Sequence, residues 1–370
     1  MGRKNCIILL TIFVITGVTL LFSVLNACAE TLAAQEKEAS DYAESGSELI
    51  KLEDVLERNT SGYAGIDRGE NITWSYNAVT KTLAFSGSGE IMSNEDAYNM
   101  VNGGVFSYDE NILGTWYIWL NETEHLVIGE GITGIGHSDF MYFPYLADVS
   151  LPNSLRYIAD TAFAFGGLKS VTIPKGVRDI GPYAFCETKL SKVTIKNGVK
   201  RILTAAFSDT QIEKIVFPKS VEYIDDEVLE GCEKLKKVTL SPNIREIPKR
   251  AFSDSGLRNI TIKNGIKWVA GGAFSDTLFK EITLPKSVDT ILGDDVFMGS
   301  NNLKTVKIKS KKLKIESKAF RNFPSKATII VPKGKKKSYS KMFYKAGLSK
   351  KVKIKESKKW SKDRRGNHSL

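Results

Sequence analysis

A repeat of about 22 residues fills the centre of the chain and constrains its fold more than any other feature. Two successive copies read LKSVTIPKGVRDIGPYAF from Leu168 and LSKVTIKNGVKRILTAAF from Leu190. The residue that opens each strand-like segment recurs every 22 residues, with one step of 23, at Val149, Val171, Val193, Ile215, Val238, Ile260 and Ile282. Self-similarity at a fixed period of this length predicts a solenoid of stacked coils.

The pattern inside one copy explains why the copies must stack. In Val171-Thr172-Ile173 the side chains alternate, so two apolar residues point inward and Thr172 points outward. Proline, which lacks an N–H and ends a strand ladder, follows four of these segments, at Pro152, Pro174, Pro218 and Pro285. One coil cannot bury its apolar positions alone, whereas a stack of coils forms one continuous core.

Most copies end in an Ala-Phe pair, at 162–163, 184–185, 206–207, 251–252, 273–274 and 319–320. We expect the alanine to fit a tight helical or 3₁₀ turn and the phenylalanine to fill the centre of the coil. These residues resemble the leucine-rich repeat family, specifically its bacterial BspA-like branch. The commoner consensus has Asn or Cys after the strand, whereas this place holds Gly176, Gly198, Ser220 and Asn243. We therefore expect no continuous asparagine ladder.

The resemblance implies a repeat solenoid, a leucine-rich repeat array of short parallel strands and short helical or 3₁₀ turns with an N-terminal β-hairpin cap. It also implies a bacterial surface protein that binds or adheres. We divide the chain into a signal segment at 1–29, a polar spacer at 30–60, a cap module at 61–125, a solenoid of about nine coils at 126–320, a C-terminal cap at 321–356 and a basic tail at 357–370, which we expect to be disordered.

Both caps have readable elements. Alternating residues at 72–76 and 82–86 predict a β-hairpin, with Trp74 and Trp116 as core residues of the N-terminal cap. At the other end we expect a closing strand at 328–333, a short amphipathic helix at 338–347 and an edge strand at 351–355. Such caps are needed because a solenoid otherwise exposes the apolar edges of its terminal coils.

The first residues predict export. Arg3-Lys4 precedes an apolar run from Ile7 to Leu25, the pattern of a secretory signal. Three outcomes remain open: cleavage at the A-x-A-like site around Cys28, lipidation of Cys28 in a lipobox-like sequence, or retention as an uncleaved anchor. All three place the folded chain at the cell surface or outside the cell, with membrane contact only through this segment.

The charge is unevenly distributed along the sequence. The chain has a net charge of +11, yet residues 301–370 hold 24 Lys and Arg against 3 Asp and Glu. The rest of the chain is therefore acidic on balance. This composition predicts that the basic character belongs to the C-terminal end alone.

The inventory of reactive side chains does not support catalysis. None of the three histidines, His125, His137 and His368, lies near a nucleophile-elbow or zincin motif. Ser-Asp-Thr/Ser sequences recur at 208–210, 253–255 and 275–277, but they lack the pattern of calcium-binding coils, and these residue types favour turns. We predict no enzyme, no metal site and no cofactor. Cys186 and Cys232 lie about two coils apart, too far for a disulfide, and we expect semi-buried free thiols.

Binding is the better-supported function. One outward column consists of Ser150, Thr172, Thr194, Val216, Thr239, Thr261, Thr283 and Lys307, and a second register holds Tyr157, Asp179, Arg201, Tyr223, Glu246, Trp268 and Thr290. Aromatic and arginine side chains are common at binding hot spots, although threonine also simply suits an exposed strand. From these columns we select Tyr157, Arg201, Tyr223, Trp268, Thr194, Thr239 and Thr261 as candidates to bind an extracellular protein or glycan.

The basic end supports a second hypothesis. In this alternative the chain is a structural or spacer protein of the cell envelope, held to anionic cell-wall polymers by its basic C-terminal region. The residues expected to bind these polymers are Lys333, Lys335, Lys336, Lys337, Lys351, Lys353, Lys355, Arg364 and Arg365. The alternative interpretation is a solvated tail. The predicted export and the lack of a recognition motif argue against dedicated nucleic-acid binding.

Overall fold

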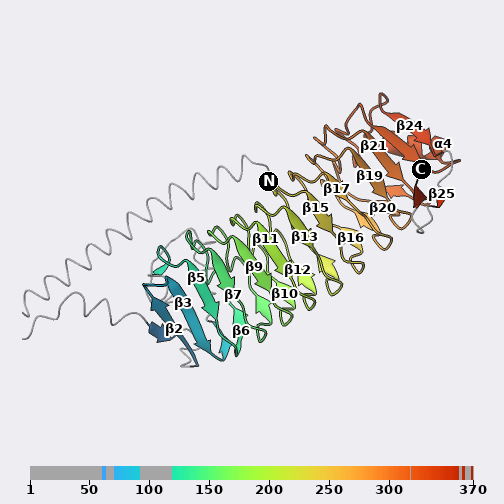
Figure 1. Ribbon diagram of the computed structural model, residues 1–370. Helices are drawn as coiled ribbons and strands as arrows, with labels where there is room; N and C mark the ends of the chain where they lie inside the picture. Colours follow the sequence, from blue (N-terminus) through green and yellow to red (C-terminus); the bar gives the residue numbers. More distant parts are fainter. Residues whose placement is uncertain are drawn as a thin grey trace, which may run out of the picture. The chain divides into compact units, whose positions relative to one another are not determined.

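The computed structural model describes residues 61–63, 71–91, 119–316, 318–357, 361–362 and 368–369. Each coil of the repeat contributes one strand to a first face, one shorter strand to a second face, and a run of turns that closes the coil (Figure 1). Strands of successive coils pair in parallel, exactly as stacking of identical units requires, for example Val171 with Val193. The structure therefore confirms the predicted solenoid and its register.

The first face begins with the N-terminal cap and ends with the C-terminal cap. Its strands are β1 (Ser61–Tyr63), β2 (Ile72–Asn77), β3 (Thr82–Gly87), β5 (His125–Ile128), β7 (Asp148–Ser150), β9 (Ser170–Ile173), β11 (Lys192–Ile195), β13 (Lys214–Val216), β15 (Lys237–Thr239), β17 (Asn259–Ile260), β19 (Glu281–Leu284), β21 (Thr305–Ile308), β23 (Thr328–Val331) and β24 (Lys353–Glu356). Hydrogen-bonded pairing is interrupted between β11 and β13 and between β17 and β19.

The second face is made of two- to four-residue strands. They are β4 (Gly89–Glu90), β6 (Ile132–Ile135), β8 (Tyr157–Ile158), β10 (Asp179–Ile180), β12 (Arg201–Ile202), β14 (Tyr223–Ile224), β16 (Glu246–Ile247), β18 (Trp268–Val269), β20 (Thr290–Ile291) and β22 (Lys314–Ile315). Its ladder is interrupted between β14 and β16. Two further strands, β25 (Ser361–Lys362) and β26 (His368–Ser369), form a separate antiparallel pair.

The Ala-Phe segments form what we call the turn side. The Phe163, Phe185 and Phe207 amides each donate a hydrogen bond to the next coil, to the carbonyls of residues 184, 206 and 228. Equivalent bonds link the coils as far as Val296, so this ladder continues where the strand ladders are interrupted. The residue before each alanine has a positive φ, such as 53° at Tyr183. Helical and 3₁₀ turns need negative φ. The expected helical turns are therefore absent from these segments, and each segment is instead a turn that contains a residue in the left-handed region.

A column of phenylalanine rings runs through the core behind the turn side. The rings of Phe163, Phe185 and Phe207 are nearly parallel, with centroids 5.3 and 5.4 Å apart. Leu229 occupies the equivalent position in the next coil, and the column resumes between Phe252 and Phe274 at 5.9 Å. All these side chains are fully buried, so each coil contributes its largest apolar group to its neighbours.

Glycine and serine replace the asparagine ladder after the first-face strands. The amides of Gly131, Gly198 and Gly265 each donate to a serine hydroxyl of the following coil, at 2.9–3.1 Å. A Cβ atom at Gly198 would lie 2.0 Å from the carbonyl oxygen of Lys175. Close stacking of the coils therefore requires glycine at this position.

The structure describes the predicted N-terminal hairpin and the predicted helix and strands of the C-terminal cap. The hairpin of β2 and β3 pairs with β5, and Trp74 is buried opposite Phe85, as expected. At the C-terminal end β23 and β24 flank helix α4 (Lys336–Lys345). The ring of Phe343 on this helix lies 4.9 Å from that of Phe320 and so covers the end of the phenylalanine column.

Other expectations fall on residues that the structure does not describe. The signal segment with Cys28, the spacer, Trp116, Arg364 and Arg365 all lie outside the described residues. Within the described part of the chain, no helix has the length and apolar character needed to cross a bilayer.

Candidate binding surface

The structure divides the predicted binding residues between two faces. Thr194 and Thr239 lie on first-face strands β11 and β15, and Thr261 directly follows β17. Tyr157, Arg201, Tyr223 and Trp268 lie on second-face strands β8, β12, β14 and β18. The two sets belong to different sheets, and each must be considered as a separate surface.

On the second face, Arg201 and Tyr223 are each hydrogen-bonded to an aspartate within the chain. The Arg201 guanidinium donates to both carboxylate oxygens of Asp179, at 2.7 and 2.9 Å, and lowers the pKa of that carboxyl. The Tyr223 hydroxyl donates to Asp225 at 2.8 Å. Partial burial, followed by this hydrogen bond, raises the pKa of Tyr223 to about 12.

The remaining two second-face candidates differ in accessibility. The ring of Tyr157 is half-buried against Gly134, where a Cβ atom would lie 2.4 Å from it, and burial followed by a hydrogen bond to Glu90 raises the pKa of Tyr157. Trp268 is 40% exposed, between Glu246 and Thr290 of the neighbouring strands. Trp268 is therefore more accessible than Tyr157, and its exposure is close to the 43% of Tyr223.

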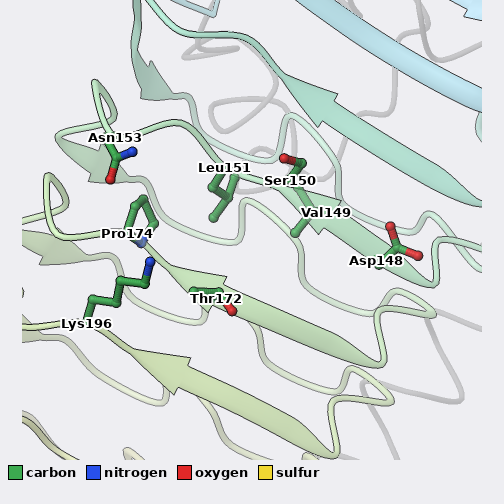
Figure 2. Close-up of a pocket in the computed structure, with 8 residues that line it drawn as sticks. All are labelled: Asp148, Val149, Ser150, Leu151, Asn153, Thr172, Pro174 and Lys196. Carbon is green, nitrogen blue, oxygen red and sulfur yellow. The ribbon is translucent and has the colours of Figure 1, made fainter.

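A shallow hollow lies on the first face, across β7, β9 and β11. Its volume is about 320 Å³. Figure 2 shows Asp148 at one end and Lys196 at the other, with Ser150 and Thr172 between them. The carboxylate of Asp148 also lies 2.9 Å from Nδ1 of the His125 ring, within hydrogen-bond distance. Of the outward column predicted from the sequence, Ser150 and Thr172 line this hollow, whereas the candidates Thr194, Thr239 and Thr261 are not among its lining residues.

Sequence reasoning missed three lysines on the first face, the first of them on β11, which borders this hollow. Lys192, Lys214 and Lys237 occupy equivalent exposed positions on β11, β13 and β15, in three successive coils. Within the described residues none of them forms an ion pair. The repeat register does contain the signal, because each lysine directly precedes the strand-opening residue of its copy.

Acidic residues are scarce on the first face around these lysines. Glu213 pairs with Lys236 at 2.9 Å and Glu281 pairs with Lys307 at 2.6 Å. Further exposed bases on the first face and its bounding turns are Lys169, Lys175, Lys196, Lys219, Arg258, Lys263, Lys280 and Lys286. Composition along the chain predicts that basic character is confined to the C-terminal end, and this prediction is wrong. The first face is also basic, because the coil period gathers lysines on it.

Lys307 corrects a further expectation. The repeat register places Lys307 in the outward column, yet only 8% of its surface is exposed. It lies between Thr283 and Ile330 of the adjacent strands. Its ammonium group reaches Glu281, and this ion pair compensates for the burial of its charge.

The C-terminal candidates lie on the cap. Lys333, Lys335, Lys336 and Lys337 are at the start of α4, and Lys351, Lys353 and Lys355 lie on or just before β24. All are exposed except Lys335, which is half-buried, and none forms an ion pair among the described residues. The strand that carries Lys353 and Lys355 is the last one of the first-face sheet, paired with β23.

The two thiols are more buried than expected. Cys186 is 6% exposed and Cys232 is fully buried, and both are free. The Cys232 sulfur lies 3.3 Å from the Thr210 hydroxyl, and burial raises the pKa of this thiol to about 12. Ser300 occupies the corresponding slot after Gly299 and bonds Thr277 in the same way. Cys232 is therefore a packing residue that stays protonated at neutral pH.

No catalytic arrangement is evident in the described part of the chain. No group of three or more His, Cys, Asp or Glu there could hold a metal ion. The two described histidines of the solenoid each pair with an aspartate of the next coil, His125 with Asp148 and His137 with Asp160. These pairs link coils and lie far from either cysteine along the stack.

The fold and its register define a leucine-rich repeat protein. The family model described as "BspA type Leucine rich repeat region (6 copies)" matches residues 116–236, 157–278 and 270–362, which together cover more than half of the chain. The chain therefore belongs to the BspA-type leucine-rich repeat family. Among curated proteins, none matches it.

Several solved bacterial structures are similar to the chain. A leucine-rich repeat protein from Eubacterium ventriosum is 20% identical with a TM-score of 0.49, covering 74% of this chain and 78% of that one. One from Bacteroides ovatus is 19% identical with a TM-score of 0.45 and covers 79% of each chain. A leucine rich cell surface protein from Faecalibacterium prausnitzii is 17% identical with a TM-score of 0.35, covering 80% of this chain and 96% of that one.

Proposed function

We propose that this chain is an exported binding protein of the cell surface whose first face takes an acidic extracellular protein or glycan. The observation that carries the proposal is the row of Lys192, Lys214 and Lys237, three exposed cations without ion-pair partners among the described residues. Lys214 and Lys237 are directly paired on β13 and β15, where neighbouring strands lie about 4.8 Å apart, and Lys192 holds the equivalent place one coil earlier, across the interruption of the ladder. Such a row matches a ligand with repeated negative charges better than a single anion.

Two observations support a location at the cell surface. The N-terminal segment has the pattern of a secretory signal, and the BspA-type family contributes the expectation of a surface protein. Outside the cell, acidic glycans and acidic protein surfaces are available ligands, whereas nucleotides and cytoplasmic nucleic acids are not. Binding without chemistry agrees with a site built from lysine and threonine side chains on a rigid sheet.

Neutralising the lysine row is expected to weaken polyanion binding about 100-fold. We estimate about 1 kcal/mol for each lysine at an anionic surface, hence about 3 kcal/mol for Lys192→Gln/Lys214→Gln/Lys237→Gln. The measurement is the affinity of purified full-length protein for dextran sulfate, with uncharged dextran as the ligand control. Affinity should also fall steeply as salt rises, because exposed charges are screened.

Two matched variants define the surface. Lys189→Gln/Lys234→Gln/Lys249→Gln removes the same charge from exposed lysines on the turn side and should reduce affinity far less. Tyr223→Ala/Trp268→Ala tests the second face and should leave dextran sulfate binding unchanged. Equal losses for the two lysine triples would show that net charge, and not the first face, determines binding, and the proposal would be wrong.

A second candidate function is attachment of the C-terminal cap to anionic envelope polymers. The exposed lysines of α4 and β24, which lack ion-pair partners among the described residues, favour it. Replacing Lys351, Lys353 and Lys355 by Gln is expected to release the protein from isolated cell envelopes at a lower salt concentration than the wild type requires. Co-sedimentation across a salt series measures this. If the variant is released at the same salt concentration as the wild type, these three lysines do not hold the protein to the envelope. Retention would then depend on the N-terminal segment or on Arg364 and Arg365.

A further inference from the structure

Two aromatic residues on the turn side occupy backbone positions that aromatic residues rarely adopt. Tyr142 has a φ of 65° and Phe165 a φ of 61°. The same position of later coils holds Glu187, Asp209, Gly231, Asp254, Asp276, Gly299 and Asn322. Gly, Asn and Asp are the residues that tolerate positive φ, whereas a bulky side chain there is a steric outlier. A strained position of this kind is a reason to look for a function.

Burial in the core does not account for these rings. Tyr142 is 40% exposed and Phe165 is 36% exposed, while the phenylalanines of the core column are fully buried. The two exposed rings stack on each other, with centroids 5.2 Å apart and planes inclined by 20°. Tyr145, in the same turn segment as Tyr142, is 62% exposed, and Tyr183 of the third coil is 40% exposed. The first three coils thus present an aromatic surface on the turn side.

Negative charge lies at the end of this stacked pair. Glu187 follows Phe165 at the equivalent position of the next coil, and Asp209 follows Glu187. Partial burial and the nearby charge of Glu187 raise the pKa of Tyr142 to about 12, and partial burial and Asp209 raise the pKa of Glu187. Among the described residues Glu187 has no ion-pair partner. We call Tyr142, Phe165 and Glu187 the aromatic–acidic ridge.

We propose that the aromatic–acidic ridge is a second binding site, which takes arginine or lysine side chains from an extended basic segment of a partner protein. The faces of electron-rich rings attract cations, most often the guanidinium of arginine. The Glu187 carboxylate can accept hydrogen bonds from the same cation. Charge separates this site from the first face: the ridge fits a basic ligand, whereas the lysine row fits an acidic one. The inference does not depend on the function proposed for the first face.

The experiment replaces the two strained rings with the residue found at Asn322. Full-length Tyr142→Asn/Phe165→Asn protein is titrated with a fluorescent peptide of four Arg-Gly repeats, with a Glu-Gly peptide as the ligand control. We expect affinity for the Arg-Gly peptide to fall by about tenfold or more. We also expect the unfolding temperature to rise by roughly 2 °C or more, because asparagine relieves the strain at both positions. Loss of binding together with a gain in stability is a result that a structural role would not produce.

The matched control is Leu278→Asn/Met298→Asn, which removes two other exposed apolar side chains of the turn side and should leave binding unchanged. Glu187→Gln keeps both rings and should weaken Arg-Gly binding severalfold. Unchanged binding by Tyr142→Asn/Phe165→Asn, or a lower unfolding temperature, would overturn the proposal. Binding that depends on the rings but neither on Glu187 nor on salt would also overturn it, since a neutral ligand such as a glycan would then be the one that stacks there.

Discussion

Replacing Phe185 by alanine is expected to lower the free energy of unfolding by about 3–5 kcal/mol. Phe185 is fully buried, and its ring stacks between those of Phe163 and Phe207 at 5.3 and 5.4 Å. Truncation removes contacts with the coils on both sides and leaves a cavity in the middle of the column. In a solenoid the stability of one coil depends on its neighbours, and we expect the loss to spread to adjacent coils.

Chemical denaturation monitored by circular dichroism measures this loss, and hydrogen exchange locates it. Phe185→Leu is the matched control, because Leu229 already occupies the equivalent place in another coil. Phe185→Leu should lower the free energy of unfolding by about 1–1.5 kcal/mol, because leucine keeps most of the buried apolar volume. If Phe185→Ala cost no more than Phe185→Leu, the column would not be the main contact between coils, contrary to our account of the fold.

Replacing Phe343 by alanine is the second large effect that we expect, at about 3–5 kcal/mol. Phe343 is fully buried on α4 and packs against Phe320 and Tyr339, with ring centroids 4.9 and 6.0 Å away. Without it the helix loses its main anchor, and the apolar edge of the last coil becomes accessible to solvent. Repeat proteins need such a cap to remain soluble, so aggregation should accompany the loss of stability.

The neighbouring residue supplies the control for this variant. Tyr344 is 40% exposed on the same helix, and Tyr344→Ala should change stability by no more than about 0.5 kcal/mol. Thermal unfolding and light scattering measure stability and aggregation together. A soluble Phe343→Ala protein with an unchanged unfolding temperature would show that α4 is not a cap.

The candidate site was only partly predictable from the sequence. Its charges come together because they occupy the same position in successive coils, although they lie far apart along the chain. Composition along the sequence places the excess of bases in residues 301–370, whereas Lys192, Lys214 and Lys237 lie in a part of the chain that is acidic on balance. The coils bring these three lysines to neighbouring strands, while acids such as Glu187 and Asp209 lie on the turn side. Position within the repeat, and not position in the chain, decides which charges act together.

The solenoid, its register, the N-terminal hairpin and the C-terminal helix could be predicted from the sequence alone. A 22-residue period, inward Val and Ile side chains and the Ala-Phe pair specify which residues must be buried, and burial in turn requires stacking. These features are readable because each depends on spacing and polarity within one copy. The same reasoning found the hairpin around Trp74 and the C-terminal helix and strands.

The conformation of the turns and the partners of the polar side chains could not be predicted from the sequence, because both depend on contacts between coils. Positive φ at Tyr142 and Phe165 arises because each turn must donate hydrogen bonds to the next coil, and residue type alone predicts no such backbone for an aromatic. Likewise, the ion pairs of Arg201 and Lys307 depend on carboxylates that neighbouring coils supply. Contacts between copies, which the pattern within a copy does not contain, set the geometry of both proposed binding sites.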